Sequence, residues 1–304
     1  MIAVSPEEDS SRAATLGSSA YLRLAGLTIE LVGIDLELKV NGMMNGFLVP
    51  PDKPDVTIKA RFGELDDGRD GQFLFDSGSH WQLYRVGEDY QFRLAVPSKN
   101  WQPYKLARFN SNFTQGEILC SRERYSESEP LYPLEYPLDE VLFVHLLAMN
   151  GLGVELHSCG LVDETGKGYL FIGHSEAGKT TTARLWEQRA GVKVLSDDRI
   201  IVRREGSDFF MYGTPWHGEA ELAYPDRARL DHVFLLGRGL ENRLVPTAQA
   251  QAAAEIFARS FTPFHSLEGL EFTLSFLSDL TESVPCHELQ FVPDERVVDF
   301  IREH

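Results

Sequence analysis

The feature that most constrains this 304-residue chain is the run Gly173-His174-Ser175-Glu176-Ala177-Gly178-Lys179-Thr180, which fits the pattern G-x-x-x-x-G-K-S/T. It follows an apolar segment, 169–172, and opens a helical pattern over 180–190. In such a loop, backbone N–H groups surround a polyphosphate, the lysine adds a cation and the hydroxyl ligates Mg²⁺. We therefore expect ATP and Mg²⁺ to bind here, through Gly173, Ser175, Glu176, Ala177, Gly178, Lys179, Thr180 and Thr181.

Two adjacent carboxylates, Asp197 and Asp198, stand 18 residues after Lys179, at the end of an apolar strand expected over 192–195. Beside a phosphate-binding loop, one carboxylate can hold the metal and the other can take the proton from an attacking hydroxyl. We expect Thr180 and Asp197 among the metal ligands, and Asp198, Asp197 and Lys179 among the catalytic residues. The alternative is a surface turn with two solvated aspartates.

Two further segments carry side chains with catalytic chemistry. His157 lies on the strand expected before the loop, and imidazole titrates near neutral pH, so this residue is a candidate catalytic group. The segment 213–221 carries Trp216 between Gly213 and Gly218, followed by Glu219 and Glu221. Glu219 is a candidate metal ligand, and either glutamate is a candidate substrate contact. The alternatives are a packed histidine and an ordered loop around a buried tryptophan.

Residues 1–130 are predicted to form a β-rich N-terminal domain that presents or recognises the substrate. Short strands are expected over 20–40, and a β-hairpin over 81–96 with its turn at 87–89. Three prolines between residues 127 and 137 favour an extended connector. We therefore place the domain boundary between residues 130 and 131.

Residues 131–304 are predicted to form an α/β domain with a mixed sheet, in which hairpins flank the strand that precedes the loop. The pattern predicts hairpins over 157–172 and 200–212, strands over 192–195, 233–236 and 288–292, and helices over 139–150, 180–190, 248–261, 267–283 and at the end of the chain.

Charge and cysteine content exclude several other classes of protein. The formal net charge is −17, from 29 Lys and Arg against 46 Asp and Glu, which disfavours nucleic acid and anionic membranes as partners. Residues 1–12 lack the pattern of a signal peptide, and no apolar stretch approaches the ~20 residues that span a bilayer. Cys120, Cys159 and Cys286 lack C-x-x-C spacing and fit reduced thiols. We expect a cytoplasmic protein.

The run from 156 to 212 resembles the catalytic domain of the HPr kinase/phosphorylase family, within the phosphoenolpyruvate carboxykinase-like superfamily. The residues that carry the resemblance are Leu161-Val162-Asp163, Gly166, Gly168, the loop 173–180 and Leu195-Ser196-Asp197-Asp198. The resemblance implies that Lys179 contacts the phosphates of ATP, Thr180 binds Mg²⁺ and Asp198 is the general base. The family's histidine, placed without gaps, falls on Ser158, whose side chain would point to the opposite face of a strand from His157.

Two departures from the family indicate an acceptor other than HPr: Glu176 replaces a glycine, and the cluster around Trp216 replaces the family's signature segment. The leading prediction is an ATP- and Mg²⁺-dependent kinase that phosphorylates a serine of a protein or peptide. One alternative is a kinase for a small hydroxyl-bearing molecule. Another is a nucleotide-binding sensor without transfer activity. The resemblance also implies a homo-oligomer.

Overall fold

The chain divides into two compact units, and the computed structural model describes residues 14–40, 42–96 and 102–304. The first unit runs to Asp139, and the second comprises Leu24–Gly26 and Glu140–His304. Residues 131–139 thus belong to the first unit, because Leu131 is buried and bridges to Leu38. The division falls after the predicted boundary at 130/131. The polar start expected over residues 1–12 lies outside the described residues.

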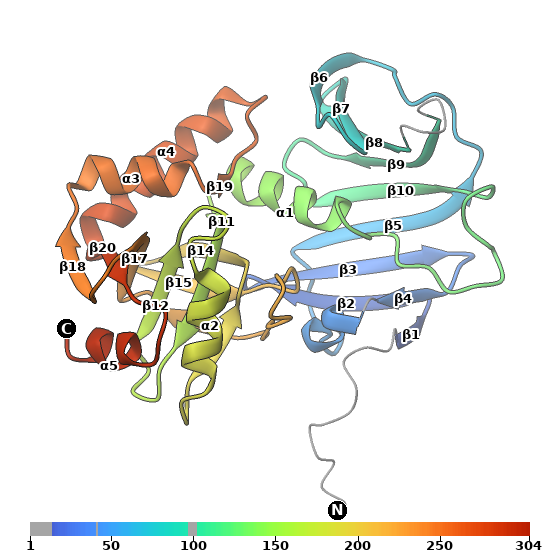
Figure 1. Ribbon diagram of the computed structural model, residues 1–304. Helices are drawn as coiled ribbons and strands as arrows, with labels where there is room; N and C mark the ends of the chain where they lie inside the picture. Colours follow the sequence, from blue (N-terminus) through green and yellow to red (C-terminus); the bar gives the residue numbers. More distant parts are fainter. Residues whose placement is uncertain (1–13, 41, 97–101) are drawn as a thin grey trace, which may run out of the picture. The chain divides into compact units, whose positions relative to one another are not determined.

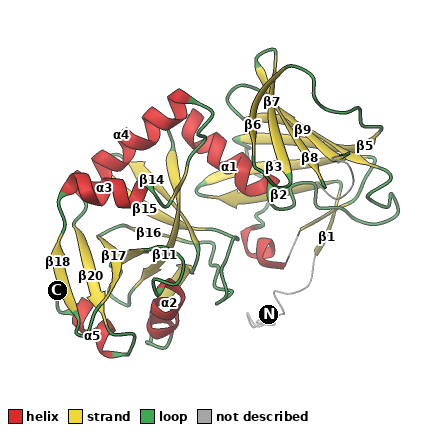
Figure 2. Ribbon diagram, turned by 45° about the horizontal axis from the view of Figure 1, so that its top comes forward, coloured by secondary structure: helices red, strands yellow, loops and turns green. Residues whose placement is uncertain are grey.

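The first unit is drawn almost entirely as strands and loops in Figure 2. Its elements are β1 (Ala14–Gly17), β2 (Ser19–Leu24), β3 (Leu27–Ile34), β4 (Leu38–Val40), the 3₁₀-helix η1 (Gly42–Phe47), β5 (Val56–Gly63), β6 (Gln72–Asp76), β7 (Trp81–Val86), β8 (Asp89–Ala95), β9 (Pro103–Phe109) and β10 (Gln115–Ser121). Eight strands form one sheet in the order β2-β3-β5-β10-β9-β8-β7-β6, and β1 pairs with β4. The hairpin predicted over 81–96 is present as β7 and β8.

The second unit is an α/β fold around a mixed sheet. Its elements are α1 (Leu138–Met149), β11 (Gly153–Val162), β12 (Gly168–Ile172), α2 (Lys179–Glu187), β13 (Lys193–Ser196), β14 (Arg199–Glu205), β15 (Asp208–Gly213), β16 (Arg227–Arg229), β17 (His232–Arg238), β18 (Arg243–Pro246), α3 (Gln249–Phe257), β19 (Ser260–Phe261), α4 (Leu267–Ser283), β20 (Cys286–Phe291) and α5 (Arg296–Arg302). The strand order is β16-β15-β14-β11-β12-β17-β20-β18, and β13 and β19 also pair with β11. Among the described residues, no helix is long and apolar enough to cross a membrane.

Helices cover both faces of this sheet (Figure 1). Alternate residues of β12 point to opposite faces. Leu170 joins a core with α3 and α4, whereas Phe171 joins a core with α2 and α5 that contains Trp186. Because both faces are buried, the strand before the loop is a continuous apolar run, 169–172.

The helix predicted over 248–261 is shorter than expected. It ends at Phe257, and Ser260–Phe261 forms β19, which pairs with Leu156 and Glu155 of β11. The free edge of β11 offers backbone partners, and an aromatic residue suits a strand better than an exposed helix end. Helix α2 also ends early, at Glu187 instead of residue 190. The β19 pairing brings Phe261 beside the candidate site.

The three cysteines are free thiols, as the sequence predicts. Cys120 and Cys159 are buried, and Cys286 is partly buried. Burial raises the pKa of Cys120 to about 11 and that of Cys286 to about 12. These thiols therefore stay protonated at neutral pH, which makes them poor nucleophiles and poor metal ligands.

Candidate active site

The loop between β12 and α2 is shaped by its two glycines. A Cβ on Gly173 would lie 2.6 Å from the Cβ of Ala177, and a Cβ on Gly178 would lie 2.8 Å from Cζ of Phe291. Gly178 also has φ 107, a conformation that side-chain-bearing residues avoid. Nζ of the buried Lys179 donates to the carbonyl of Gly173 at 3.0 Å. The end of the loop, at Lys179, thus contacts its start, at Gly173, through the side chain of the lysine.

A cavity of about 350 Å³ lies beside this loop. The loop and the start of α2 line it with Ser175, Glu176, Gly178, Lys179, Thr180 and Thr181, and other segments add His157, Asp198, Gly218 and Glu219. Two residues predicted to bind the cofactor, Gly173 and Ala177, are buried in the loop and are not among the lining residues. Glu221, the other candidate of its segment, is also not among them.

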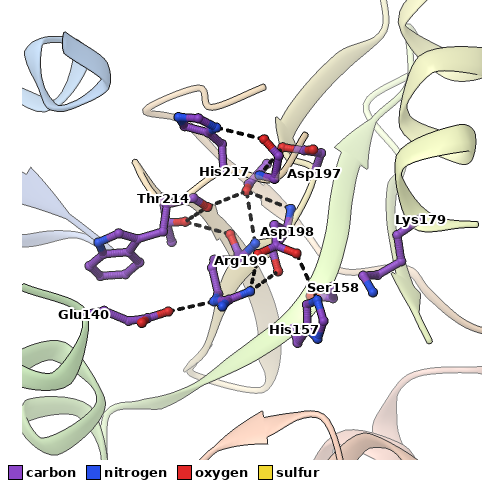
Figure 3. A network of polar contacts seen from close by, with 12 residues as sticks. Glu140, His157, Ser158, Lys179, Asp197, Asp198, Arg199, Thr214 and His217 are labelled. Carbon is purple, nitrogen blue, oxygen red and sulfur yellow. Dashed lines mark hydrogen bonds and ion pairs between the residues drawn. The ribbon is translucent and has the colours of Figure 1, made fainter. Parts of the chain in front are cut away.

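Asp198 lines the cavity, and each oxygen of its carboxylate has a partner (Figure 3). Its Oδ1 lies 2.9 Å from Nε2 of His157, and Arg199 donates to its Oδ2. Burial alone would raise the pKa of this carboxyl, but the hydrogen bond from His157 and the positive charges of Arg199 and Lys179 outweigh it and lower the pKa. Asp198 is therefore ionised at neutral pH and is available as a proton acceptor.

The structure distinguishes His157 from its neighbour Ser158. The His157 side chain is 31% exposed and contacts Asp198. Ser158 is fully buried, and its hydroxyl donates to the carbonyl of Leu156 at 3.2 Å. Adjacent residues of a strand face opposite ways, so only one of the two can line the cavity. The imidazole of His157 is the one that does.

Arg199 is a site residue that sequence reasoning missed. Its Nε lies 2.7 Å from Oε1 of Glu140 and 3.7 Å from Oε1 of Glu155, and its Cζ lies 4.5 Å from the ring centre of Phe261. Burial acts to lower the pKa of this guanidinium, but the surrounding carboxylates raise it overall. The sequence shows Glu140 within the apolar helix α1, but it does not indicate which cation pairs with it. The cluster fixes the guanidinium that holds Asp198.

Asp197 does not share the environment of Asp198. It is 1% exposed, and its two oxygens accept backbone N–H groups from Gly218 and Ala220, each at 2.9 Å, and from Leu222 at 3.4 Å. Both oxygens are thus engaged inside the protein, and Asp197 does not line the cavity. The geometry does not support the metal-ligand and catalytic roles expected for Asp197. It anchors the segment that carries Glu219.

Asp197→Ala is expected to lower the free energy of unfolding by about 3 kcal/mol, because the N–H groups of Gly218 and Ala220 lose a charged acceptor in a buried place. Urea denaturation measures this loss. Glu187→Ala, at an exposed position of α2, serves as the control and should change stability by less than about 0.5 kcal/mol. Equal stability of the two variants would show that the segment does not depend on this carboxylate.

Comparisons with known proteins leave the family of the chain open. No protein-family model matches the sequence, and no curated protein matches it. Among solved structures, the chain is similar to the HPr(Ser) kinase/phosphatase from Coxiella burnetii, with 13% sequence identity and a TM-score of 0.29, over 49% of this chain and 95% of that one. At this identity and TM-score the likeness supports no conclusion about activity. A conclusion about activity therefore rests on the side chains of the site.

The lining residues fit a metal-bound nucleotide. Within the described chain, no three His, Cys, Asp or Glu side chains form a metal-binding group. Mg²⁺ at a nucleotide takes one or two protein oxygens together with phosphate and water oxygens. The hydroxyl of Thr180 and the exposed carboxylate of Glu219 border the same cavity. Lys179 supplies the only cation of the loop itself, and burial lowers its pKa although Asp198 opposes the shift.

Glu176 occupies a position where its backbone favours glycine. Its φ is 66, in the left-handed region, and its side chain is exposed at the rim of the cavity. A side-chain-bearing residue in this conformation costs about 1–2 kcal/mol, and its carboxylate adds negative charge where phosphates would bind. Solvent around the exposed carboxylate screens part of this repulsion.

Glu176→Gly is expected to tighten the binding of Mg·ATP by several-fold, because it removes a negative charge beside the bound phosphates. Isothermal titration calorimetry at low salt measures the dissociation constant. Glu176→Gln removes the same charge and keeps the side chain, so it should tighten binding to a similar extent. Weaker binding by the glycine variant would contradict this account of the loop.

Proposed function

We propose that this protein is an ATP- and Mg²⁺-dependent kinase that phosphorylates a serine hydroxyl of a protein or peptide. One observation carries the proposal: a single cavity is lined by Lys179 and Thr180 of the loop and, across from them, by an ionised Asp198 paired with His157. Phosphoryl transfer needs a positioned polyphosphate, charge neutralisation and an acceptor for the hydroxyl proton. The lining residues are of the types that meet these three needs.

Each residue then has a separate task. The backbone of the loop and Lys179 bind the phosphates, and Thr180 with Glu219 would hold the metal ion. Bound ATP supplies the phosphoryl group: a bond forms between the serine oxygen and the γ-phosphorus, the bond to the bridging oxygen breaks, and ADP leaves. Asp198 accepts the serine proton as that bond forms. His157 donates to Oδ1 of Asp198 and keeps the carboxylate aimed into the cavity.

The test offers labelled ATP and Mg²⁺ to the purified full chain together with an extract of its own cells. We expect label in a polypeptide, at serine. Lys179→Ala should lose both binding and transfer, because the loop loses its cation. Label found only in small metabolites would replace the acceptor with a small hydroxyl-bearing molecule. Tight ATP binding with no transfer to any acceptor would overturn the kinase proposal and leave a nucleotide sensor.

A further inference from the structure

A second cavity, of about 300 Å³, lies in the second unit between the sheet and α5. Its lining residues come mostly from strands β12, β17, β18 and β20 and helix α5; these elements are labelled in Figure 1. Tyr169 stands at the start of β12, whereas the phosphate-binding loop follows the end of that strand at Gly173. Four residues of strand separate the two by ~13 Å. The second cavity shares no lining residue with the first.

One wall of this cavity is an ordered aromatic surface. The rings of His232 and Phe234 have centroids 5.9 Å apart and planes within 5° of parallel, and the Tyr169 ring lies within 20° of both. Leu244 and Ile301 add apolar surface. A flat ring can stack on such a wall and bury its faces. The volume lies at the lower end of the about 300–1,000 Å³ typical of ligand pockets, which suits one or two fused rings.

The polar groups of the cavity are all of the kind that binds anions. Lys167, His232, His287 and His304 line it, and these include three of the nine histidines of the chain. No Asp or Glu is among its lining residues in the described structure. In a chain with a net charge of −17, a lining without carboxylates and with four basic side chains is a marked local exception.

Two carboxylates beside lining residues, Asp231 next to His232 and Asp163 at the hydroxyl of Tyr169, have other partners. Asp231 accepts the N–H of Gly168 at 2.9 Å, and its other oxygen lies 3.6 Å from Nε of Arg229. Asp163 accepts hydrogen bonds from Thr165 at 2.7 Å and from the hydroxyl of Tyr169 at 3.1 Å. In the described structure, neither carboxylate forms an ion pair with Lys167 or with a lining histidine.

We propose that this cavity is a second ligand site, which binds a small planar aromatic anion with its ring against His232 and Phe234 and its anionic group near Lys167. The site is independent of the proposed kinase activity, since it uses none of the same residues. Aromatic carboxylates and nucleoside monophosphates share this chemistry. The test therefore includes both.

The protonation of His232 gives the site a pH dependence. Burial, the charge of Lys167 and that of His287 lower the pKa of His232, and Asp231 opposes them. His304, which follows α5, and Tyr169 of β12 line the same cavity as His232. A bound anion favours the protonated imidazole, so binding takes up a proton and affinity rises as pH falls from 8 to 6.

The experiment measures binding by calorimetry to the full chain carrying Lys179→Ala, which disables the phosphate-binding loop. The probes are indole-3-carboxylate and AMP, each compared with its uncharged counterpart, indole-3-carboxamide or adenosine. We expect one anion to bind at least about tenfold more tightly than its uncharged counterpart at pH 6, and to weaken at pH 8. The anion that binds identifies the carboxylate or the nucleotide as the natural class.

Variants assign the binding to this cavity. Lys167→Gln and His232→Gln should each weaken binding of the anion by about tenfold. Lys167 is exposed, and its substitution leaves the backbone contacts in place. His80→Gln, an exposed histidine of the first unit, should leave the affinity unchanged. Circular dichroism confirms that each variant is folded. Equal affinity for charged and uncharged probes, no binding at millimolar concentration, or an unchanged affinity in folded Lys167→Gln would overturn the proposal.

Discussion

Asp198→Asn is expected to lower kcat for phosphoryl transfer by about 10²–10⁴-fold, the usual contribution of a positioned general base. The amide cannot accept the serine proton, yet it keeps the size of the side chain, and its one oxygen can still accept a hydrogen bond from either His157 or Arg199. Binding of Mg·ATP should change by no more than a few-fold, because Lys179 and the loop backbone are intact. A single-turnover assay with labelled ATP, beside a calorimetric titration, separates the two effects.

A matched control for this variant is Asp294→Asn. Asp294 also pairs with an arginine, Arg296 at 2.6 Å, but outside the cavity. It should retain wild-type turnover. Transfer by Asp198→Asn at the control rate would remove Asp198 from the mechanism, and loss of nucleotide binding alone would point to a role in holding the metal.

The pH profile of the wild type follows from the same carboxylate. The pKa of Asp198 lies below its ordinary 3.8, so its ionised form persists from neutral pH down to about pH 4. The corresponding stabilisation is present above pH 3.8 and is lost as pH falls through the lower pKa of the folded state. A loss of kcat between pH 5 and 7 would therefore report another group.

Arg199→Met is expected to lower the free energy of unfolding of the second unit by about 3–5 kcal/mol. The change leaves Glu140 and Glu155, whose side chains are 8% and 0% exposed, without the cation between them. Two desolvated carboxylates near one another then repel, and one must take up a proton or the unit must open. Urea denaturation followed by the fluorescence of the buried Trp186 measures the loss.

Two companion variants identify the cause of this loss. Arg199→Met combined with Glu140→Gln should recover part of the stability, because it removes one of the stranded charges. Arg199→Lys keeps the charge but cannot bridge Glu140 and Asp198 with one planar group, so it should be intermediate. A loss below about 1 kcal/mol for Arg199→Met would mean that the carboxylates do not depend on this guanidinium.

Local sequence patterns predicted the elements whose formation depends mainly on residues close in sequence. The helix expected over 267–283 matches α4, Leu267–Ser283, because Ser266 caps it and its apolar residues keep one face. Strands β5, β9 and β10 are not among the individual strands predicted above, although β5 alternates between apolar, buried residues and polar ones. Their partners are distant: β5 pairs in parallel with both β3 and β10, so register and burial are set by the sheet and not by neighbours in sequence.

The same distinction explains the site. The loop 173–180 was predictable because all of its chemistry lies in eight consecutive residues. The sequence could not separate the tasks of Asp197 and Asp198, since the segment after Trp216 decides which carboxylate it binds. The cluster around Arg199 was out of reach, because Glu140 lies 59 residues before the arginine and Phe261 lies 62 residues after it.

Strand β11 pairs with β14 and β19 along its first half and with β12 and β13 along its second. The loop and its α2 helix leave the ribosome early, yet Phe261 beneath Arg199 is synthesised 88 residues after Gly173. A nascent chain that has exposed the whole phosphate-binding motif therefore still lacks part of the support for Asp198. The surroundings of Asp198 and Arg199 are therefore complete only when synthesis has passed β19.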